Sequence, residues 1–189
     1  MSLWSHNPRR GIIEVQAPYF FRILKLGLEF YEQYFDCPYP FSKYDQIFLP
    51  CFTFNAMENP GIVAILDKNF VPYMESVSQI INRDRMFLHE MCHMWNGNLM
   101  SIEYYNDLWL KEGFTEYICQ LALQYLVDKS PKGTFAFEGR IMANFRIRGL
   151  EGFKIDLMCE NDNHPLSNMC TDDKNTLQYY GHCTYRKGS

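Results

Sequence analysis

Apolar residues repeat at helical spacing along much of the chain, and two short runs typical of strands interrupt this pattern. Periods of three to four residues predict helices over residues 17–35, 71–97, 107–127 and 135–148. Strands are predicted over 45–51 and 62–66, because these runs are short, apolar and partly β-branched. The strands lie next to the second predicted helix in the sequence, which indicates an α+β fold with a small sheet beside that helix.

The two ends of the chain lack this regular pattern. Residues 1–16 are expected to be irregular, and the acidic run 160–175 is expected to be a loop. The final residues, TLQYYGHCTYRKGS, begin another helical pattern. A chain of 189 residues fits one domain or slightly more.

Composition and charge narrow the classes of function. The net charge is −4 with mixed signs, so nothing indicates binding to nucleic acid or to an anionic membrane surface. No apolar run approaches the ~20 residues of a membrane span. The seven cysteines are scattered without a paired CxxC pattern, which favours reduced thiols and a cytoplasmic location; a secreted form without its leader is the alternative.

The stretch FLHEMCHMWNG contains the most specific chemical signal. His89 and His93 are four residues apart on a predicted helix, which puts both imidazoles on one face and within reach of one ion. Residues 94–111 leave room for a turn and a returning helix, so Glu112 can complete a His₂Glu set for one Zn²⁺ per chain. An isolated HExxH match is more often accidental, but a downstream glutamate on the next helix favours the metal site.

Two further glutamates accompany this set. Glu90 follows the first histidine and can accept a proton from an attacking water and pass it to the leaving amine. Glu116 lies one helical turn beyond Glu112 and either orients a histidine ligand or is an exposed carboxylate. These residue types indicate hydrolysis of an amide by a metal-activated water.

Four motifs in the same order resemble the gluzincin zinc aminopeptidases, the family of alanyl and puromycin-sensitive aminopeptidases and leukotriene hydrolase. HEMCHMWNGNLMS is similar to the family's HExxHxWFGNLVT, and NDLWLKEGFTEY to its WNDLWLNEGFAEY. FNAMENPG resembles GAMENWG, and TYRKGS resembles SYxKGA. The resemblance covers about 17–189 and implies a thermolysin-like catalytic domain, incomplete at its C-terminus, with a truncated helical lobe.

The resemblance also implies a role for each matching residue. His89, His93 and Glu112 would bind zinc, and Glu90 would be the general base. Glu58 would pair with the α-amine of a peptide, so the substrates are peptides with a free N-terminus. The residues implied to line the substrate backbone and first pocket are Asn55, Ala56 and Met57. Tyr185 would stabilise the oxyanion, with Tyr179 and Tyr180 as alternatives.

The chain departs from the family pattern at several positions. Asn55 replaces a glycine, Pro60 a tryptophan, Asn96 a phenylalanine and Lys111 an asparagine. None of these changes removes a ligand, and no metal-binding role is expected for Cys92, His164, His182 or Cys183. Family members are several times longer, so further family domains are expected partners. The alternative function is an inactive or partial zinc-binding relative, and a third, weaker interpretation is an epoxide hydrolase.

Overall fold

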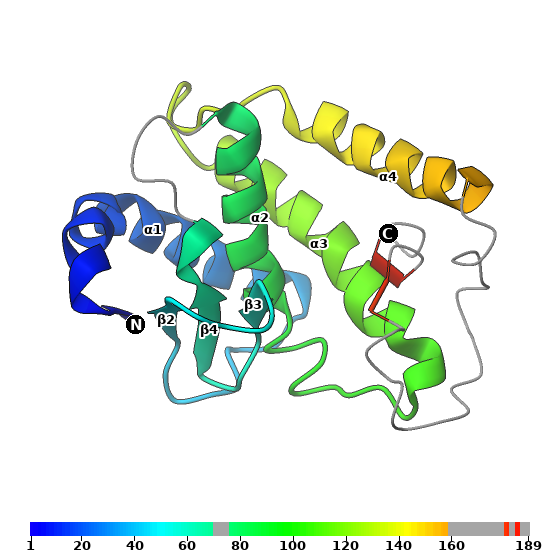
Figure 1. Ribbon diagram of the computed structural model, residues 1–189, viewed down its shortest axis with the longest axis horizontal. Coiled ribbons are helices and arrows are strands. Elements are labelled where there is room, and N and C mark those ends of the chain that lie inside the picture. The colour runs from blue at the N-terminus through cyan, green and yellow to red at the C-terminus, as the bar shows by residue number, and fades with distance from the viewer. Residues whose placement is uncertain (70–75, 159–179, 182–183, 186–189) are drawn as a thin grey trace.

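The computed structural model describes residues 1–69, 76–158, 180–181 and 184–185 (Figure 1). Among these residues the protein is α+β, with one small mixed sheet and long helices packed beside it. The strands are β1 (Ser2–Ser5), β2 (Asp45–Leu49), β3 (Ala56–Met57) and β4 (Ile62–Leu66). The helices are α1 (Asn7–Tyr34), α2 (Val77–Cys92), α3 (Leu108–Asp128) and α4 (Ile141–Met158). Short 3₁₀ helices cover Asp67–Asn69 and Tyr105–Asp107.

The sheet has the strand order β1-β2-β4-β3. β1, β2 and β4 run parallel, and β3 pairs antiparallel to β4 with Ala56 opposite Ile65. The predicted strand 62–66 is confirmed, and the predicted strand 45–51 ends at Leu49, just before Pro50. This arrangement puts the short strand β3 at the sheet edge that faces α2 (Figure 1).

The first helix is longer than predicted. The expectation of an irregular segment over residues 1–16 is wrong, because β1 and the start of α1 occupy it. His6 Nε2 lies 2.6 Å from Asp67 Oδ2 and Arg9 Nε lies 3.3 Å from the same oxygen, so tertiary contacts hold this end against the sheet. Pro18, which resembles a helix-start residue, instead lies inside α1.

The second helix is shorter than the predicted 71–97. Ser76 and Gln79 form a capping box, so α2 begins at Val77. It ends at Cys92, and His93 is the C-cap residue. Gly97 has a φ of +137° and its amide donates to Met100 O at 2.7 Å, which folds the chain back toward the next helix. Gly97, the end of the predicted helix, therefore lies in a turn after α2.

The core lies where α1, α2 and α3 meet (Figure 1). Gly27 allows α1 to approach α2 closely, since a Cβ there would lie 2.7 Å from Leu88 Cδ2. The buried Tyr31 hydroxyl donates to Leu88 O at 2.8 Å, one residue before the first histidine of the HExxH motif. This packing fixes the last turn of α2, which carries the candidate site.

The last long helix is displaced from its predicted range of 135–148. Turns occupy residues 135–140, where Glu138 N donates to Phe135 O and Gly139 has a φ of +77°. Phe135 and Phe137 are buried in the core, so their apolar spacing reflects anchoring of a loop and does not continue the helix. α3, by contrast, matches the predicted 107–127 closely.

None of the described helices is long and apolar enough to cross a membrane.

Candidate active site

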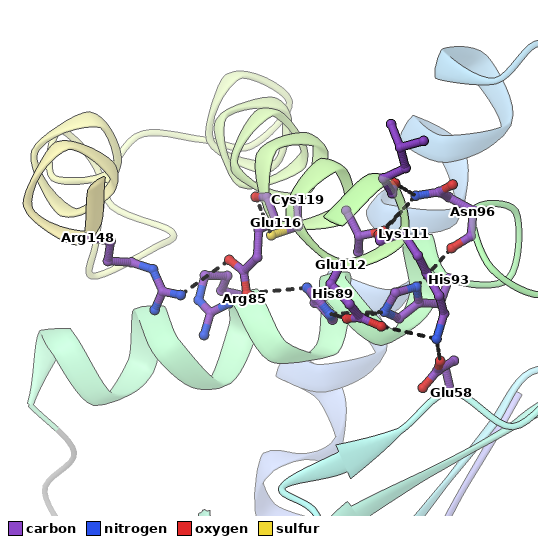
Figure 2. A network of polar contacts seen from close by, with 12 residues as sticks. Glu58, Arg85, His89, His93, Asn96, Lys111, Glu112, Glu116, Cys119 and Arg148 are labelled. Atoms are coloured by element: carbon purple, nitrogen blue, oxygen red, sulfur yellow. Dashed lines mark hydrogen bonds and ion pairs between the residues drawn. The ribbon is translucent and has the colours of Figure 1, made fainter. Parts of the chain in front are cut away.

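Two histidines and a glutamate point their side chains at a common position between α2 and α3 (Figure 2). His89 Nε2 and His93 Nε2 lie 3.0 Å apart. Glu112 Oε2 lies 3.3 Å from each of these nitrogens. All three residues are buried. The structure therefore brings together the three residues that the sequence nominated as metal ligands.

The spacing of these three atoms fits a tetrahedral zinc site. Zinc–nitrogen and zinc–oxygen bonds of about 2.0–2.2 Å at a tetrahedral angle separate the ligand atoms by roughly 3.3–3.5 Å. The observed separations of 3.0, 3.3 and 3.3 Å are close to this value. Two imidazole nitrogens and one carboxylate oxygen are also a common donor set of catalytic zinc, in which the fourth position stays open.

The ring positions of both histidines are supported from their other nitrogen. His93 Nδ1 lies 2.9 Å from Asn96 O, a distance at which the ring nitrogen donates to the carbonyl. His89 Nδ1 makes no hydrogen bond, but Glu116 Oε1 lies 3.4 Å away, within ion-pair distance. Such contacts select which nitrogen faces the metal. Glu116 thus has the orienting position that was one of its two predicted alternatives, and it is buried.

Two arginines surround Glu116 on the side away from the histidines. Arg85 Nη1 forms an ion pair with Glu116 Oε1, and Arg148 Nη2 lies 3.4 Å from Oε2 (Figure 2). Burial raises the pKa of Glu116, but the charge of Arg85, followed by His89 and Arg148, outweighs it and lowers the pKa. The carboxylate is therefore held in its charged form. Nothing in the sequence pattern singled out these arginines, because they reach Glu116 from two other helices.

Glu58 and Lys111 form a second buried ion pair beside the histidines. Lys111 Nζ binds Glu58 Oε1 and lies 3.1 Å from Glu112 Oε1 (Figure 2). Asn98 Nδ2 donates to Glu58 O at 2.7 Å and fixes the backbone there. Burial raises the pKa of Glu58, but His93 and Lys111 outweigh it and lower the pKa. Glu58 is thus buried and charged.

Glu90 lies among these groups with its side chain buried. Ligand atoms of Glu58, Glu90 and His93 all lie within 4.8 Å of one another. Burial raises the pKa of Glu90 to about 7, and the opposing charges of His89 and His93 reduce this rise. A carboxylate whose pKa is near neutrality is well suited to exchange protons with water and with an amine.

The electrostatic field of the site favours a cation. Burial alone would lower the pKa of His93, but Glu112, Glu58 and Glu90 raise it to about 9. Three carboxylates thus face two imidazoles in a small buried volume. A dication at the common position would be stabilised by the same carboxylates.

A cavity of about 660 Å³ opens beside His89 and Glu90. Asn55 from the β3 end and the tyrosines Tyr180 and Tyr185 also line it. Ala56 and Met57 are half-buried in β3, next to Asn55, but they do not line this cavity. The cavity is large enough for several residues of a peptide.

Tyr185 lies beside the histidines, with its ring centroid 6.1 Å from that of His89. Burial, followed by the Glu112 carboxylate, raises the pKa of Tyr185 well above its usual value, so the hydroxyl keeps its proton and can donate. Tyr180 also lines the cavity and is more exposed, so it remains an alternative. Tyr179, His164, His182 and Cys183 lie outside the described residues.

Asn96, Lys111 and the two arginines Arg85 and Arg148 make contacts in the site that the sequence did not predict. Asn96 Nδ2 donates to Leu110 O, Lys111 O and Thr115 Oγ1 at 3.0–3.1 Å, which ties the end of the HExxH segment to the start of α3. Asn96 and Lys111 both depart from the family pattern, and this departure is the feature of the sequence that could have pointed to their contacts. Cys92 is buried, and it is absent from the candidate ligand groups among the described residues.

Comparison with known proteins identifies a family of similar chains. Residues 19–189 match the model of the peptidase family M1 domain. The chain is 32% identical to aminopeptidase N of Canis lupus familiaris over 90% of its own length and 17% of that relative. It is 40% identical to aminopeptidase N of Streptomyces lividans over 57% of this chain and 13% of the relative. It is 45% identical to human endoplasmic reticulum aminopeptidase 2 over 53% of this chain and 10% of the relative.

The α+β fold is compatible with part of a peptidase domain, and the family match identifies it further: the chain belongs to the peptidase M1 family. The resemblance to the gluzincin aminopeptidases is thereby confirmed. The chain spans 17% of the canine relative's length.

Proposed function

We propose that this chain carries the catalytic site of a zinc-dependent aminopeptidase with a thermolysin-like arrangement. The observation that carries the proposal is the convergence of His89 Nε2, His93 Nε2 and Glu112 Oε2 at separations of 3.0–3.3 Å. The family match supports the peptidase class, and the names of the relatives support removal of N-terminal residues. His89, His93 and Glu112 would hold one Zn²⁺ per chain.

When held by His89, His93 and Glu112, zinc would supply two effects: a lower pKa for a bound water molecule and polarisation of the scissile carbonyl. Glu90 accepts the proton of the attacking water at its carboxylate and gives it to the leaving amine. Tyr185 donates a hydrogen bond to the oxyanion that develops at the carbonyl oxygen. Glu116 and the Asn96 carbonyl hold the two imidazoles in orientation.

Glu58 gives the reaction its preference for chain ends. Its buried, charged carboxylate is suited to bind the α-ammonium of a peptide substrate. An internal peptide bond presents a neutral amide at this position, which cannot compensate the buried charge. Asn55, Ala56 and Met57 precede Glu58 on the sheet edge and would contact the first residue of the substrate.

The central test compares the wild-type chain with Glu90→Gln. We expect both to retain about one zinc by mass spectrometry, and only the wild type to release the chromophore of aminoacyl reporters. Glu103→Gln, an exposed glutamate in the loop before α3, is the matched control and should retain both properties. N-acetylated reporters should be cleaved more slowly than reporters with a free amine, because they present no ammonium to Glu58.

Zinc retention without turnover in the wild type would instead favour a zinc-binding relative that acts as a partner module. Failure to retain zinc would contradict the proposal itself. Cys37, Cys51, Cys92 and Cys119 are free thiols, in line with the expected reduced cysteines. The cytoplasmic location itself stays a prediction from the sequence.

A further inference from the structure

The Lys111 ammonium lies where the proposed function places the ammonium of a substrate. It binds Glu58 Oε1, and its second carboxylate neighbour is Glu112 Oε1 at 3.1 Å (Figure 2). The side chains of Lys111 and Glu58 are 14% and 10% exposed, so water screens this pair little. A lysine ammonium and a peptide α-ammonium are the same chemical group, a compact cation with three donors.

The surrounding residues shape a defined position for this lysine. Asn96 Nδ2 donates to Lys111 O at 3.1 Å and fixes the backbone from which the side chain extends. A Cβ on Gly97 would lie 2.9 Å from Lys111 Cε, so a side chain at Gly97 would collide with the lysine stem. Asn98 holds the backbone of Glu58 at the other end of the pair. The Asn96-Gly97-Asn98 segment therefore supports both partners of the ion pair.

From this geometry we infer that the Lys111 ammonium competes with the substrate's α-ammonium for the Glu58 carboxylate, which we call the amine anchor. Resting on the proposed role of Glu58, the inference is that a peptide N-terminus binds only after it displaces the Lys111 ammonium. A substrate ammonium gains little binding free energy at Glu58 while the Lys111 ammonium is present, because the Lys111 ammonium is already desolvated and paired with the carboxylate. Lys111 thus weakens amine binding and reduces the preference for free N-termini.

The test uses 3-methylbutylamine, a protonated amine without a hydrolysable bond, and its neutral analogue 3-methylbutan-1-ol. Binding to the zinc-loaded chain is followed by NMR titration. In the wild type we expect the amine and the alcohol to bind within about tenfold of one another. A larger preference for the amine in the wild type would overturn the inference, and this measurement requires no variant.

Removal of the Lys111 charge should expose the anchor. Lys111→Asn, and Lys111→Gln as a second variant with a longer stem, should bind the amine about 10- to 100-fold more tightly and leave alcohol binding unchanged. Lys132→Asn, at an exposed lysine in the turn after α3, is the matched control and should behave as the wild type. A folded Lys111 variant without this gain would overturn the inference.

A double variant separates this inference from the proposed function. Glu58→Gln added to Lys111→Asn should abolish the gain in amine affinity. Persistence of the gain in the double variant would show that the amine binds elsewhere, which contradicts the role proposed for Glu58 as well. If Lys111→Asn retained zinc and aminopeptidase turnover but showed no gain in amine affinity, only the inference about Lys111 would be contradicted.

Discussion

Glu112 and Glu116 stand one turn apart on α3, and both carboxylates face the same imidazole from opposite sides (Figure 2). Glu112 Oε2 is 3.3 Å from His89 Nε2, and Glu116 Oε1 is 3.4 Å from His89 Nδ1. Both are buried. Two glutamates at helical spacing thus have nearly equivalent positions relative to His89.

The difference lies in what else each carboxylate contacts. The second neighbour of Glu112 Oε2 is another imidazole nitrogen, His93 Nε2, so this oxygen faces two nitrogens that can bind a metal ion. Both oxygens of Glu116 are bound by arginines, Arg85 at Oε1 and Arg148 at Oε2, whereas the Oε1 oxygen of Glu112 pairs with Lys111 Nζ. The surrounding groups therefore assign one glutamate to the ligand set and the other to orientation of a ligand. Changes at the two positions should differ in the size of their effect on zinc affinity.

The largest effect is expected for Glu112→Gln. The variant replaces the anionic oxygen of the ligand set by a neutral amide, so zinc affinity should fall by more than the roughly 100-fold that loss of an orienting partner costs. Competition with a chromophoric zinc chelator measures this. Glu103→Gln serves as the control, and a loss of less than tenfold in Glu112→Gln would remove Glu112 from the ligand set.

This contrast shows what the sequence could predict and what it could not. The spacing of His89, His93 and Glu112 predicted their convergence because α2 and the turn after it keep the register of one helical face. Glu58 follows β3 and Lys111 lies in the first turn of α3, so only the tertiary fold brings them together, and no local pattern records that contact.

The fold divides in the same way. β4 and α3 have strong local periodicity and were predicted nearly to the residue. The start of α1 is held by contacts of His6 and Arg9 with the distant Asp67, and α4 begins after buried aromatic residues whose spacing imitates a helix. Where tertiary contacts determine the extent of a helix, the predicted ends of that helix were wrong. The capping box at Ser76 was readable in the sequence, and it would have corrected the start of α2.

A smaller effect is expected for Glu116→Gln. Loss of the carboxylate charge beside His89 Nδ1 should weaken zinc binding by about 10- to 100-fold. It also leaves Arg85, whose side chain is 14% exposed, without its anionic partner, so the free energy of unfolding of the metal-free chain should fall by roughly 3 kcal/mol. Zinc competition and urea denaturation measure the two effects separately. Unchanged zinc affinity with reduced stability would mean that Glu116 serves only as an arginine partner.

The smallest effect is expected for Arg148→Gln. Arg148 reaches Glu116 from α4 at 3.4 Å, and its side chain is more exposed than that of Arg85, at 20% against 14%. The longer and better solvated pair contributes less, so the free energy of unfolding should fall by about 0.5–1 kcal/mol. Arg85 still holds Glu116 in place, and zinc affinity should therefore change by less than about fivefold.

Arg146→Gln on the same helix is the control for Arg148→Gln, because its exposed side chain lies two residues earlier. Urea denaturation and zinc competition on these variants, with Arg85→Gln alongside, rank the two arginines. If Arg148→Gln weakened zinc binding as much as Glu116→Gln does, the orientation of His89 would depend on the packing of α4 against α3. The ligand site would then extend to a third helix, and the simple division of roles between the two glutamates would fail.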